Sequence, residues 1–331
     1  MIDILPTDEQ SEFIGGIASA IARGAGGKAP DWDAWKFFAD LGCIGMGLDE
    51  SVGGAGFSVA DEALVHRELG RQRVTPNVLA AALAARLASD AGDAELAQHI
   101  VAGTKRVAFA SLLAGEVSAV GLQGEFHLLT QAEDAIVLCI SPHGSALSKA
   151  ADFDRREVVQ STDETIELVR ASGSAPALLW HSDPEQRLWL HANLLVAAQL
   201  TGITEAMQDR AVEYAKVREQ FGKPIGAFQA IAHHCADMAL RSEAAASQLY
   251  FAAIALRDQA PEAAFQVSVA CAYAMDAALE NATMAIRIHG GIGFAAESGL
   301  HLFLKRAVLL RHLAGGERTQ ERAVADAYRT A

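Results

Sequence analysis

Apolar residues recur every three or four positions along the C-terminal part of the chain, as on the buried stripe of a bundle helix. One such stripe begins at Ile231, includes Cys235 and continues to Leu256. The pattern predicts long helices over residues 188–218, 226–257, 261–288 and 299–313, and a charged helix in the tail from residue 315 onward. Residues 187–331 are therefore predicted to form a four-helix bundle.

Residues 1–104 also show a helical pattern, in shorter segments. Thr7-Asp8-Glu9-Gln10 has the form of a capping box, which predicts a helix from there to about Gly24. Further helices alternate with short turns as far as Gly103. The Gly53-Gly54-Ala55-Gly56 run is too flexible for a helix and predicts a loop.

The hydrophobic period changes to two after Lys105, which is typical of strands. Short strands are predicted over residues 106–112, 126–130, 134–140, 156–160, 165–169 and 177–180. Residues 105–186 are thus predicted to be a compact β domain between two helical ones. The fold class that follows is mainly α with a small central β domain.

Charge and composition exclude several classes of function. The net charge of −14 argues against a nucleic-acid partner, whose phosphates require a basic surface. No apolar stretch is long enough to predict a membrane span, and no basic segment precedes an apolar core at the start of the sequence. We therefore expect a cytoplasmic location.

The four cysteines, Cys43, Cys139, Cys235 and Cys271, are scattered along the chain without a Cys-x-x-Cys pair. This spacing favours buried thiols over a metal site, a disulfide or a nucleophile. No metal is expected.

The junction between the first two predicted bundle helices has its own chemistry. Gly222, Pro224 and Gly226 interrupt the helical pattern within five residues. The side chains presented there are Arg218, Gln220, Phe221, Lys223 and Gln229. A guanidinium, an amide and an aromatic ring beside a helix start suit a phosphate-bearing, partly aromatic ligand. The alternative is an ordinary bundle turn with a solvated polar face.

The amino-acid sequences of two segments resemble those of the acyl-CoA dehydrogenase family. Residues 218–231 read R-E-Q-F-G-K-P-I-G-A-F-Q-A-I, and residues 286–294 read I-R-I-H-G-G-I-G-F, followed by L-H-L-F-L-K-R-A at 300–307. Residues 41–45, 53–57 and 68–71 match the family's N-terminal third in the usual order. The resemblance spans nearly the whole chain and is weakest in the middle. It implies an N-terminal helical domain, a β domain and a C-terminal four-helix bundle.

The resemblance also implies a cofactor and its contacts. It assigns the flavin pyrophosphate of FAD to Arg218, with Phe221 packing by the adenosine part and Gln229 helping at the same end. Gly290 and Gly291 would let the backbone pass the FAD of a neighbouring subunit, because these flavin sites are shared across a subunit interface. Arg287 stands where many relatives carry Gln, and a cation suits a diphosphate. Gly290 as a plain helix cap and Phe221 as a core residue are the structural alternatives.

The middle domain departs from the family pattern. In the family a loop with a Thr-Glu-Pro-like motif follows the first strand of the β domain and contacts the flavin ring. Residues 111–116 read S-L-L-A-G-E at that place and do not match. The domain is also short between Phe126 and Asp134. The chain is thus identified as a short member of the family with a reduced middle domain.

The two positions where the family places its catalytic base are empty in this sequence. Ungapped alignment puts Ala314 at the first and Ala192 at the second. Glu317, three residues beyond Ala314, is the candidate catalytic residue, and a solvated charge on the tail helix is its alternative.

The function implied is FAD-dependent α,β-dehydrogenation of an acyl-CoA thioester. The alternative is a catalytically silent subunit that completes the FAD site of a larger acyl-CoA dehydrogenase. Either function predicts an oligomer, which is a homo-oligomer or a hetero-oligomer with a longer subunit. A helical interaction module without flavin would require both segment matches to be coincidence.

Overall fold

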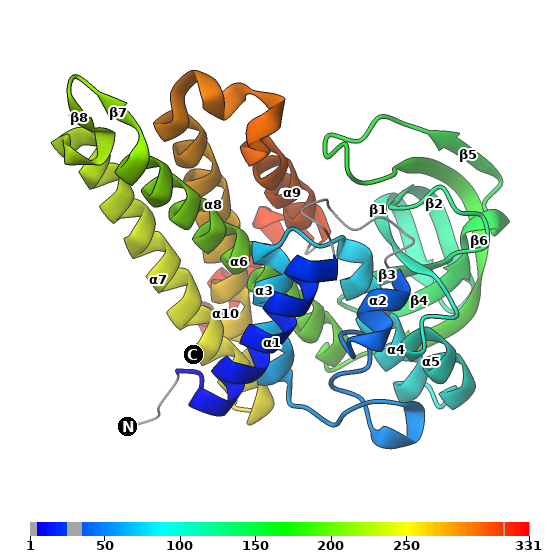
Figure 1. The fold of residues 1–331 in the computed structure, drawn as a ribbon. Coiled ribbons are helices and arrows are strands. Elements are labelled where there is room, and N and C mark those ends of the chain that lie inside the picture. The colour runs from blue at the N-terminus through cyan, green and yellow to red at the C-terminus, as the bar shows by residue number, and fades with distance from the viewer. Residues whose placement is uncertain (1–4, 25–34, 314, 331) are drawn as a thin grey trace. The chain divides into compact units, whose positions relative to one another are not determined.

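The computed structural model describes residues 5–24, 35–313 and 315–330. Two compact units make up the chain (Figure 1). The first unit comprises Met1–Ala18, Ala63–Arg73 and Asn193–Ala331, and the second comprises Ser19–Glu62 and Val74–Ala192. The three-domain division at residues 104/105 and 186/187 remains a prediction.

Helices account for most of the described chain, as the fold class predicted. They are α1 (Asp8–Gly24), α2 (Trp35–Asp40), α3 (Val59–Arg71), α4 (Pro76–Asp90), α5 (Ala94–Val101), α6 (Arg187–Val217), α7 (Gln229–Arg257), α8 (Ala263–His289), α9 (Leu300–Leu313) and α10 (Glu317–Thr330). The capping box at the start of α1 is present. The Thr7 N–H donates to Gln10 Oε1 at 3.0 Å, and the Gln10 N–H donates to Thr7 Oγ1 at 3.2 Å.

A buried polar side chain and a glycine lie where the long helices of the first unit contact one another. Helix α8 lies against α7, α9 and α10. Buried Asn281 of α8 joins it to two other helices, because its amide donates at 3.1 Å to the carbonyls of Thr204 and Met238. Where α3 crosses α6, a Cβ on Gly202 would lie 1.9 Å from the Arg67 carbonyl oxygen. This close crossing therefore requires glycine.

The apolar stripe predicted along α7 is buried only over part of its length. Met238, Ala245 and Leu249 are buried, whereas Ile231, Cys235 and Leu256 are half-buried. The sequence period correctly located an apolar face, but a period alone does not say what covers that face.

The second unit contains a sheet built from strands of the middle segment. They are β1 (Val107–Ser118), β2 (Gly121–Leu128), β3 (Ile136–Ser141), β4 (Gly144–Lys149), β5 (Arg155–Val158) and β6 (Val169–Ser182). The strand order is β2-β1-β3-β4-β6-β5, and an additional β2–β6 pairing closes the sheet on itself. Only the β1–β3 pair is parallel. Helix α4 packs on β1 and β6 and also contacts α5.

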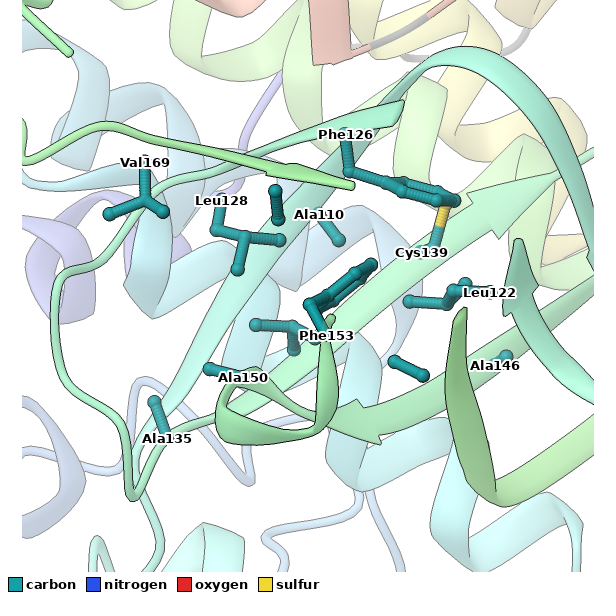
Figure 2. Packing of buried hydrophobic residues seen from close by; sticks show 13 residues of the cluster. Ala110, Leu122, Phe126, Leu128, Ala135, Cys139, Ala146, Ala150, Phe153 and Val169 are labelled. Carbon is teal, nitrogen blue, oxygen red and sulfur yellow. The ribbon is translucent and has the colours of Figure 1, made fainter. Parts of the chain in front are cut away.

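Apolar side chains fill the interior of this sheet (Figure 2). The rings of Phe126 and Phe153 lie at its centre, with centroids 5.4 Å apart and a tilt of 56° between their planes. Around them pack Ala110, Leu122, Leu128, Ala135, Val137, Cys139, Ala146, Ala150, Val169, Ala171 and Ala175. The alternation of apolar and polar positions in the sequence reflects this inward-facing set.

Three details of the sheet differ from the prediction. Strand β4 was not predicted, because its sequence, G-S-A-L-S-K, has no β-branched or aromatic residue and is extended only through pairing with β3 and β6. Of the strand predicted over residues 165–169, only Val169 belongs to a strand. Residues 111–116, which correspond to a loop in the family, lie within β1.

Three of the four thiols are buried, as the cysteine pattern favoured, whereas Cys235 is half-buried. All four cysteines are free, and Cys43, Cys139 and Cys271 are buried. Burial raises the pKa of each of these three thiols to about 12. The described residues include no group of side chains suited to hold a metal ion. Among the helices described, none is long and apolar enough to cross a membrane.

Candidate functional site

The junction predicted from the sequence is a hairpin between α6 and α7 (Figure 1). Strand β7 (Glu219–Gln220) pairs antiparallel with β8 (Lys223–Pro224), and a short 3-10 helix over Ile225–Ala227 leads into α7. The two turn residues, Phe221 and Gly222, both have positive φ, at 53° and 81°. This is the pattern of a two-residue type I′ turn, which favours glycine or asparagine rather than a bulky residue.

Phe221 therefore occupies a strained conformation at an exposed position. Its side chain is 92% exposed at the tip of the hairpin. The alternative that Phe221 is a core residue is wrong. Its nearest aromatic neighbour is Phe228, with ring centroids 6.1 Å apart in an edge-on arrangement. A strained, exposed aromatic ring is typical of a contact site for a ligand or another chain.

Cations without carboxylate partners surround the junction. Arg218 is exposed and forms no ion pair with any described residue, although the chain carries a net charge of −14. The same holds for Arg287 in the last turn of α8 and for Lys223, whose ammonium lies 4.4 Å from the centre of the Phe228 ring. The positive charge at these positions is available to an anion.

The start of α7 adds a second feature that suits an anion. This helix has 29 residues, begins at exposed Gln229 and has no side-chain hydrogen bond at its N-cap, Phe228. Its first backbone N–H groups and the positive end of its dipole are therefore open to a negatively charged ligand.

The second matching segment lies beside the first. Helix α8 ends at His289, whose ring stacks on that of Tyr214 with centroids 4.1 Å apart and 19° between the planes. Burial lowers the pKa of His289, and its Nδ1 lies 2.7 Å from the Ala285 carbonyl oxygen. The neutral ring favoured at this position can stack closely on Tyr214. The stack joins the end of α6 to the end of α8.

The glycines after α8 leave open space at this end of the bundle. Gly290 has φ 61° and ψ −137°, a conformation that only glycine adopts readily, and its N–H caps α8 by donating to the Arg287 carbonyl. The helix-cap interpretation of Gly290 is thus correct as far as structure goes. A Cβ on Gly290 or Gly291 would meet no atom within 4 Å. The backbone there is accessible to a ligand or another chain.

The candidate positions for the base are only partly described. Ala192 is buried in α6. Ala314 lies outside the described residues, and so does the side chain of Glu317, which begins α10. The first turn of α10 is held to α6 by a hydrogen bond of 2.9 Å from the Gln320 amide to Asn193 Oδ1. The role of Glu317 remains a prediction.

A buried acid–base pair was not predicted from the sequence. His191 in the first turns of α6 places Nε2 2.9 Å from Glu62 Oε2 of α3, and both residues are buried. Arg86 of α4 also contacts Glu62 Oε2, at 3.3 Å. No sequence signal could reveal this cluster, because its members are single residues on three separate helices.

An ion-pair network in the first unit was also missed. Arg67 Nε donates to both carboxylate oxygens of Glu205, at 3.0 and 2.8 Å, and Arg67 Nη1 donates to the Tyr250 hydroxyl. Arg71 contacts Glu205 at 3.2 Å and Asp209 at 2.6 Å. These contacts give each charged group a partner, so the network links α3, α6 and α7 and does not form a ligand site.

Comparison with known proteins places both ends of the chain in one family. Residues 16–105 match the family model for the acyl-CoA dehydrogenase N-terminal domain, and residues 188–328 match that for the C-terminal domain. The acyl-CoA dehydrogenase FadE34 of Mycobacterium tuberculosis is 35% identical over 94% of this chain, which spans only 46% of that relative's length. The acyl-CoA dehydrogenase IpdE2 of the same organism is 30% identical over 91% of this chain and 92% of its own.

Solved structures share the fold. Butyryl-CoA dehydrogenase from Megasphaera elsdenii matches 99% of this chain and 100% of its own, with a TM-score of 0.80 and 22% identity. A chain of the ChsE4–ChsE5 complex from Mycobacterium tuberculosis matches 100% of each, with a TM-score of 0.81 and 23% identity. At these identities the likeness concerns the fold alone.

Proposed function

Because this chain belongs to the acyl-CoA dehydrogenase family, we propose that it takes part in the FAD-dependent α,β-dehydrogenation of an acyl-CoA thioester. The observation that carries the proposal is the junction at the end of the bundle. There the Tyr214–His289 stack brings together the two segments that resemble the family's flavin-binding blocks.

The residues at this junction fit the diphosphate part of FAD. Arg218 and the open start of α7 would hold the pyrophosphate, because both supply uncompensated positive charge. Phe221 would pack by the adenosine part and Gln229 would assist at the same end. Arg287 and the Gly290–Gly291 backbone would contact the FAD of a neighbouring subunit. When bound, the flavin supplies the acceptor for the hydrogen that leaves the β-carbon as hydride.

We further propose that the chain works in an oligomer, with a longer acyl-CoA dehydrogenase subunit as partner. FadE34 is about twice as long as the stretch that matches this chain, so that relative carries a second segment of similar size in the same polypeptide. ChsE4 and ChsE5 are described as a complex of two different proteins. An exposed Phe221 and open glycines at the junction are consistent with a second chain covering this end.

A catalytically silent subunit is the second candidate function. It is favoured by the two alanines at the positions where the resemblance places the base, Ala192 and Ala314. In that case the chain would complete the FAD site of its partner, and the partner would supply the carboxylate.

Co-expression tests these proposals. The chain is purified alone and together with the longer acyl-CoA dehydrogenase encoded nearest to it, and the mass, the bound flavin and the oxidation of acyl-CoA thioesters are compared. The proposal expects flavin and oxidation in the mixed complex. If the chain alone carries a full complement of FAD and oxidises an acyl-CoA, the proposed partner subunit is refuted and the proposed dehydrogenase activity stands. A mixed complex without flavin would overturn both candidate functions.

A further inference from the structure

Three arginines of the first unit gather around one aromatic ring. The guanidinium carbon of Arg210, on α6, lies 4.6 Å from the centre of the Phe303 ring of α9, and that of Arg73, just after α3, lies 5.6 Å from the same centre. Arg306, one turn further along α9, is 2% exposed and donates to the Arg73 carbonyl oxygen at 3.1 Å. All four residues belong to the same unit.

The surroundings hold two of these cations in place. Arg73 has φ 54°, a left-handed conformation that is uncommon for residues other than glycine, and its N–H donates to the Gly70 carbonyl oxygen at 3.0 Å. Phe303 is buried, so its ring is a fixed platform for the guanidinium groups of Arg73 and Arg210. A planar guanidinium packed on a ring keeps its N–H groups directed outward, where they can donate to an anion.

The charge of Arg210 has no carboxylate partner among the described residues. Two carboxylates of the same helix are close in sequence but contact other cations. Asp209 contacts Arg71 at 2.6 Å, and Glu213 contacts Lys216 at 2.7 Å. Burial lowers the pKa of Arg210, which means that the charged form is partly desolvated without compensation.

Other partly buried arginines of this unit do have carboxylate partners. Their side chains are at most 30% exposed, and they are Arg67, Arg71, Arg241 and Arg311. Removing a charge from water without a partner costs free energy, so Arg210 calls for an explanation outside the folded chain. The residue as a whole is exposed, so an anion from solution can reach it.

The charge of Arg210 also acts on His289. Burial is the main cause of the lowered pKa of His289, and the positive charge of Arg210 lowers it further. The contact between His289 Nδ1 and the Ala285 carbonyl oxygen places the proton of the neutral ring on Nδ1, so the lone pair is on Nε2. The protonation of His289 therefore reports on the charge around Arg210.

We propose that Arg210 and Arg73, supported by the ring of Phe303, form a second phosphate-binding site of this chain, separate from the one proposed at Arg218. A phosphate group fits because its oxygens accept two parallel hydrogen bonds from a guanidinium, and because two cations at one ring match its double charge. Arg210 precedes Arg218 by about 12 Å along the helix axis. Free phosphate or pyrophosphate is one source of this group, and coenzyme A, which carries phosphates, is the other.

Calorimetric titration of the full chain, with and without FAD, tests the site. The probes are inorganic phosphate, pyrophosphate and unacylated coenzyme A. We expect Arg210→Gln to weaken binding of the tightest probe by roughly 10- to 150-fold, the usual contribution of a charge-assisted contact. Arg210→Lys keeps the charge without the planar guanidinium and should retain part of the affinity. Lys216→Gln removes a paired charge from the same helix and, as the control, should bind as wild type does.

The pKa of His289, followed by NMR titration of its ring, is a second measurement that detects binding at this place. A bound phosphate should raise this pKa in the wild type, because it opposes the charge of Arg210. Arg210→Gln should raise the pKa without any ligand, and the probes should then change it no further.

The outcomes separate this inference from the proposed function. Wild-type affinity of Arg210→Gln for all three probes, or a His289 pKa that no probe changes, would overturn the site. Equal loss of FAD affinity in Arg210→Gln and Arg218→Ala would make Arg210 part of the flavin site, which overturns this inference and leaves the proposed function standing. A chain that binds a probe through Arg210 but binds no FAD, alone or with its partner, would overturn the proposed cofactor and support the phosphate site.

The order of affinities identifies the source of the phosphate. Tighter binding of coenzyme A than of phosphate and pyrophosphate would support the site with the thioester substrate as its ligand. The reverse order would support the site with a free phosphate as its ligand.

Discussion

At the residue scale, the junction combines a positive charge without a carboxylate partner and an exposed aromatic residue with a strained backbone. Arg218 and Phe221 are three positions apart on one hairpin, and both are exposed. The chain is acidic, yet Arg218 has no carboxylate partner among the described residues, and the backbone of Phe221 adopts a conformation that costs free energy. Binding therefore explains these two side chains better than folding does.

Arg218→Ala should weaken flavin binding. A charge-assisted hydrogen bond to a phosphate contributes about 1.5 to 3 kcal/mol, which corresponds to roughly 10- to 150-fold in affinity. The measurement is a titration of the flavin-depleted complex with FAD. Arg322→Ala, an exposed arginine of α10, is the control and should bind as wild type does. Equal affinity in Arg218→Ala would refute the assignment of the pyrophosphate contact.

Phe221→Gly should affect folding and binding in opposite directions. Glycine adopts the positive φ of this turn without strain, and a strained backbone position costs on the order of 1 to 3 kcal/mol, so part of that free energy should be regained in the isolated chain. Loss of the ring should lower the affinity for FAD. The measurements are urea unfolding of the chain alone and FAD titration of the complex. A less stable variant with undiminished flavin affinity would contradict both expectations.

At the scale of elements, close helix crossings hold the first unit together. Gly70 and Gly202 face the backbone of the opposite helix, and a Cβ on either would clash with a carbonyl oxygen of that helix, at 2.1 and 1.9 Å. Backbone cannot move aside as the end of a flexible side chain can, so the two helices would have to separate.

Gly202→Ala should therefore be strongly destabilising. Overpacking a rigid contact costs about 1 to 3 kcal/mol and occasionally more, and this site belongs at the upper end of that range. Gly15→Ala in α1 is the matched control, because a Cβ there would meet no atom within 4 Å and alanine is the better helix former by roughly 1 kcal/mol. Chemical unfolding of both variants gives the comparison. A Gly202→Ala variant as stable as the wild type would mean that the crossing is looser than described.

The sequence was informative about elements and less so about contacts between them. Helical period located α6 to α9 to within a few residues, because one face of each long helix must be buried. It missed β4, which depends on its partners, and it overestimated the burial of Cys235. The sequence of the junction predicts Arg218 and Phe221 as ligand contacts, and that stays a prediction. The Tyr214–His289 stack and the Glu62–His191 pair depend on packing between separate helices. No local pattern encodes such pairs.

At the scale of the whole molecule, α7 carries apolar side chains that the described chain does not fully cover. Ile231 and Cys235 are half-buried in its first turns, and Leu240, which is 69% exposed, lies on the side of the helix opposite Ile231. In an oligomer, the exposed side of α7 that carries Leu240 would be buried by another subunit.

Leu240→Asp should weaken the oligomer. Placing a charge in an apolar contact removes buried area and leaves a carboxylate without a partner, so the mass measured by light scattering should fall at a given concentration. Val158→Asp, on exposed β5, is the control and should not change the mass. An oligomer of unchanged mass in Leu240→Asp would place the interface elsewhere.

The central claim is that this chain, in its assembled form, uses FAD to remove hydrogen from the α- and β-carbons of an acyl-CoA thioester. The most direct measurement is anaerobic titration of the flavin-loaded complex with short, branched and steroid-derived acyl-CoA thioesters, with the flavin absorbance recorded after each addition. We predict that at least one of these thioesters bleaches the flavin and yields the corresponding enoyl-CoA. Flavin that stays oxidised with every thioester, in a complex shown to bind them, would contradict the account.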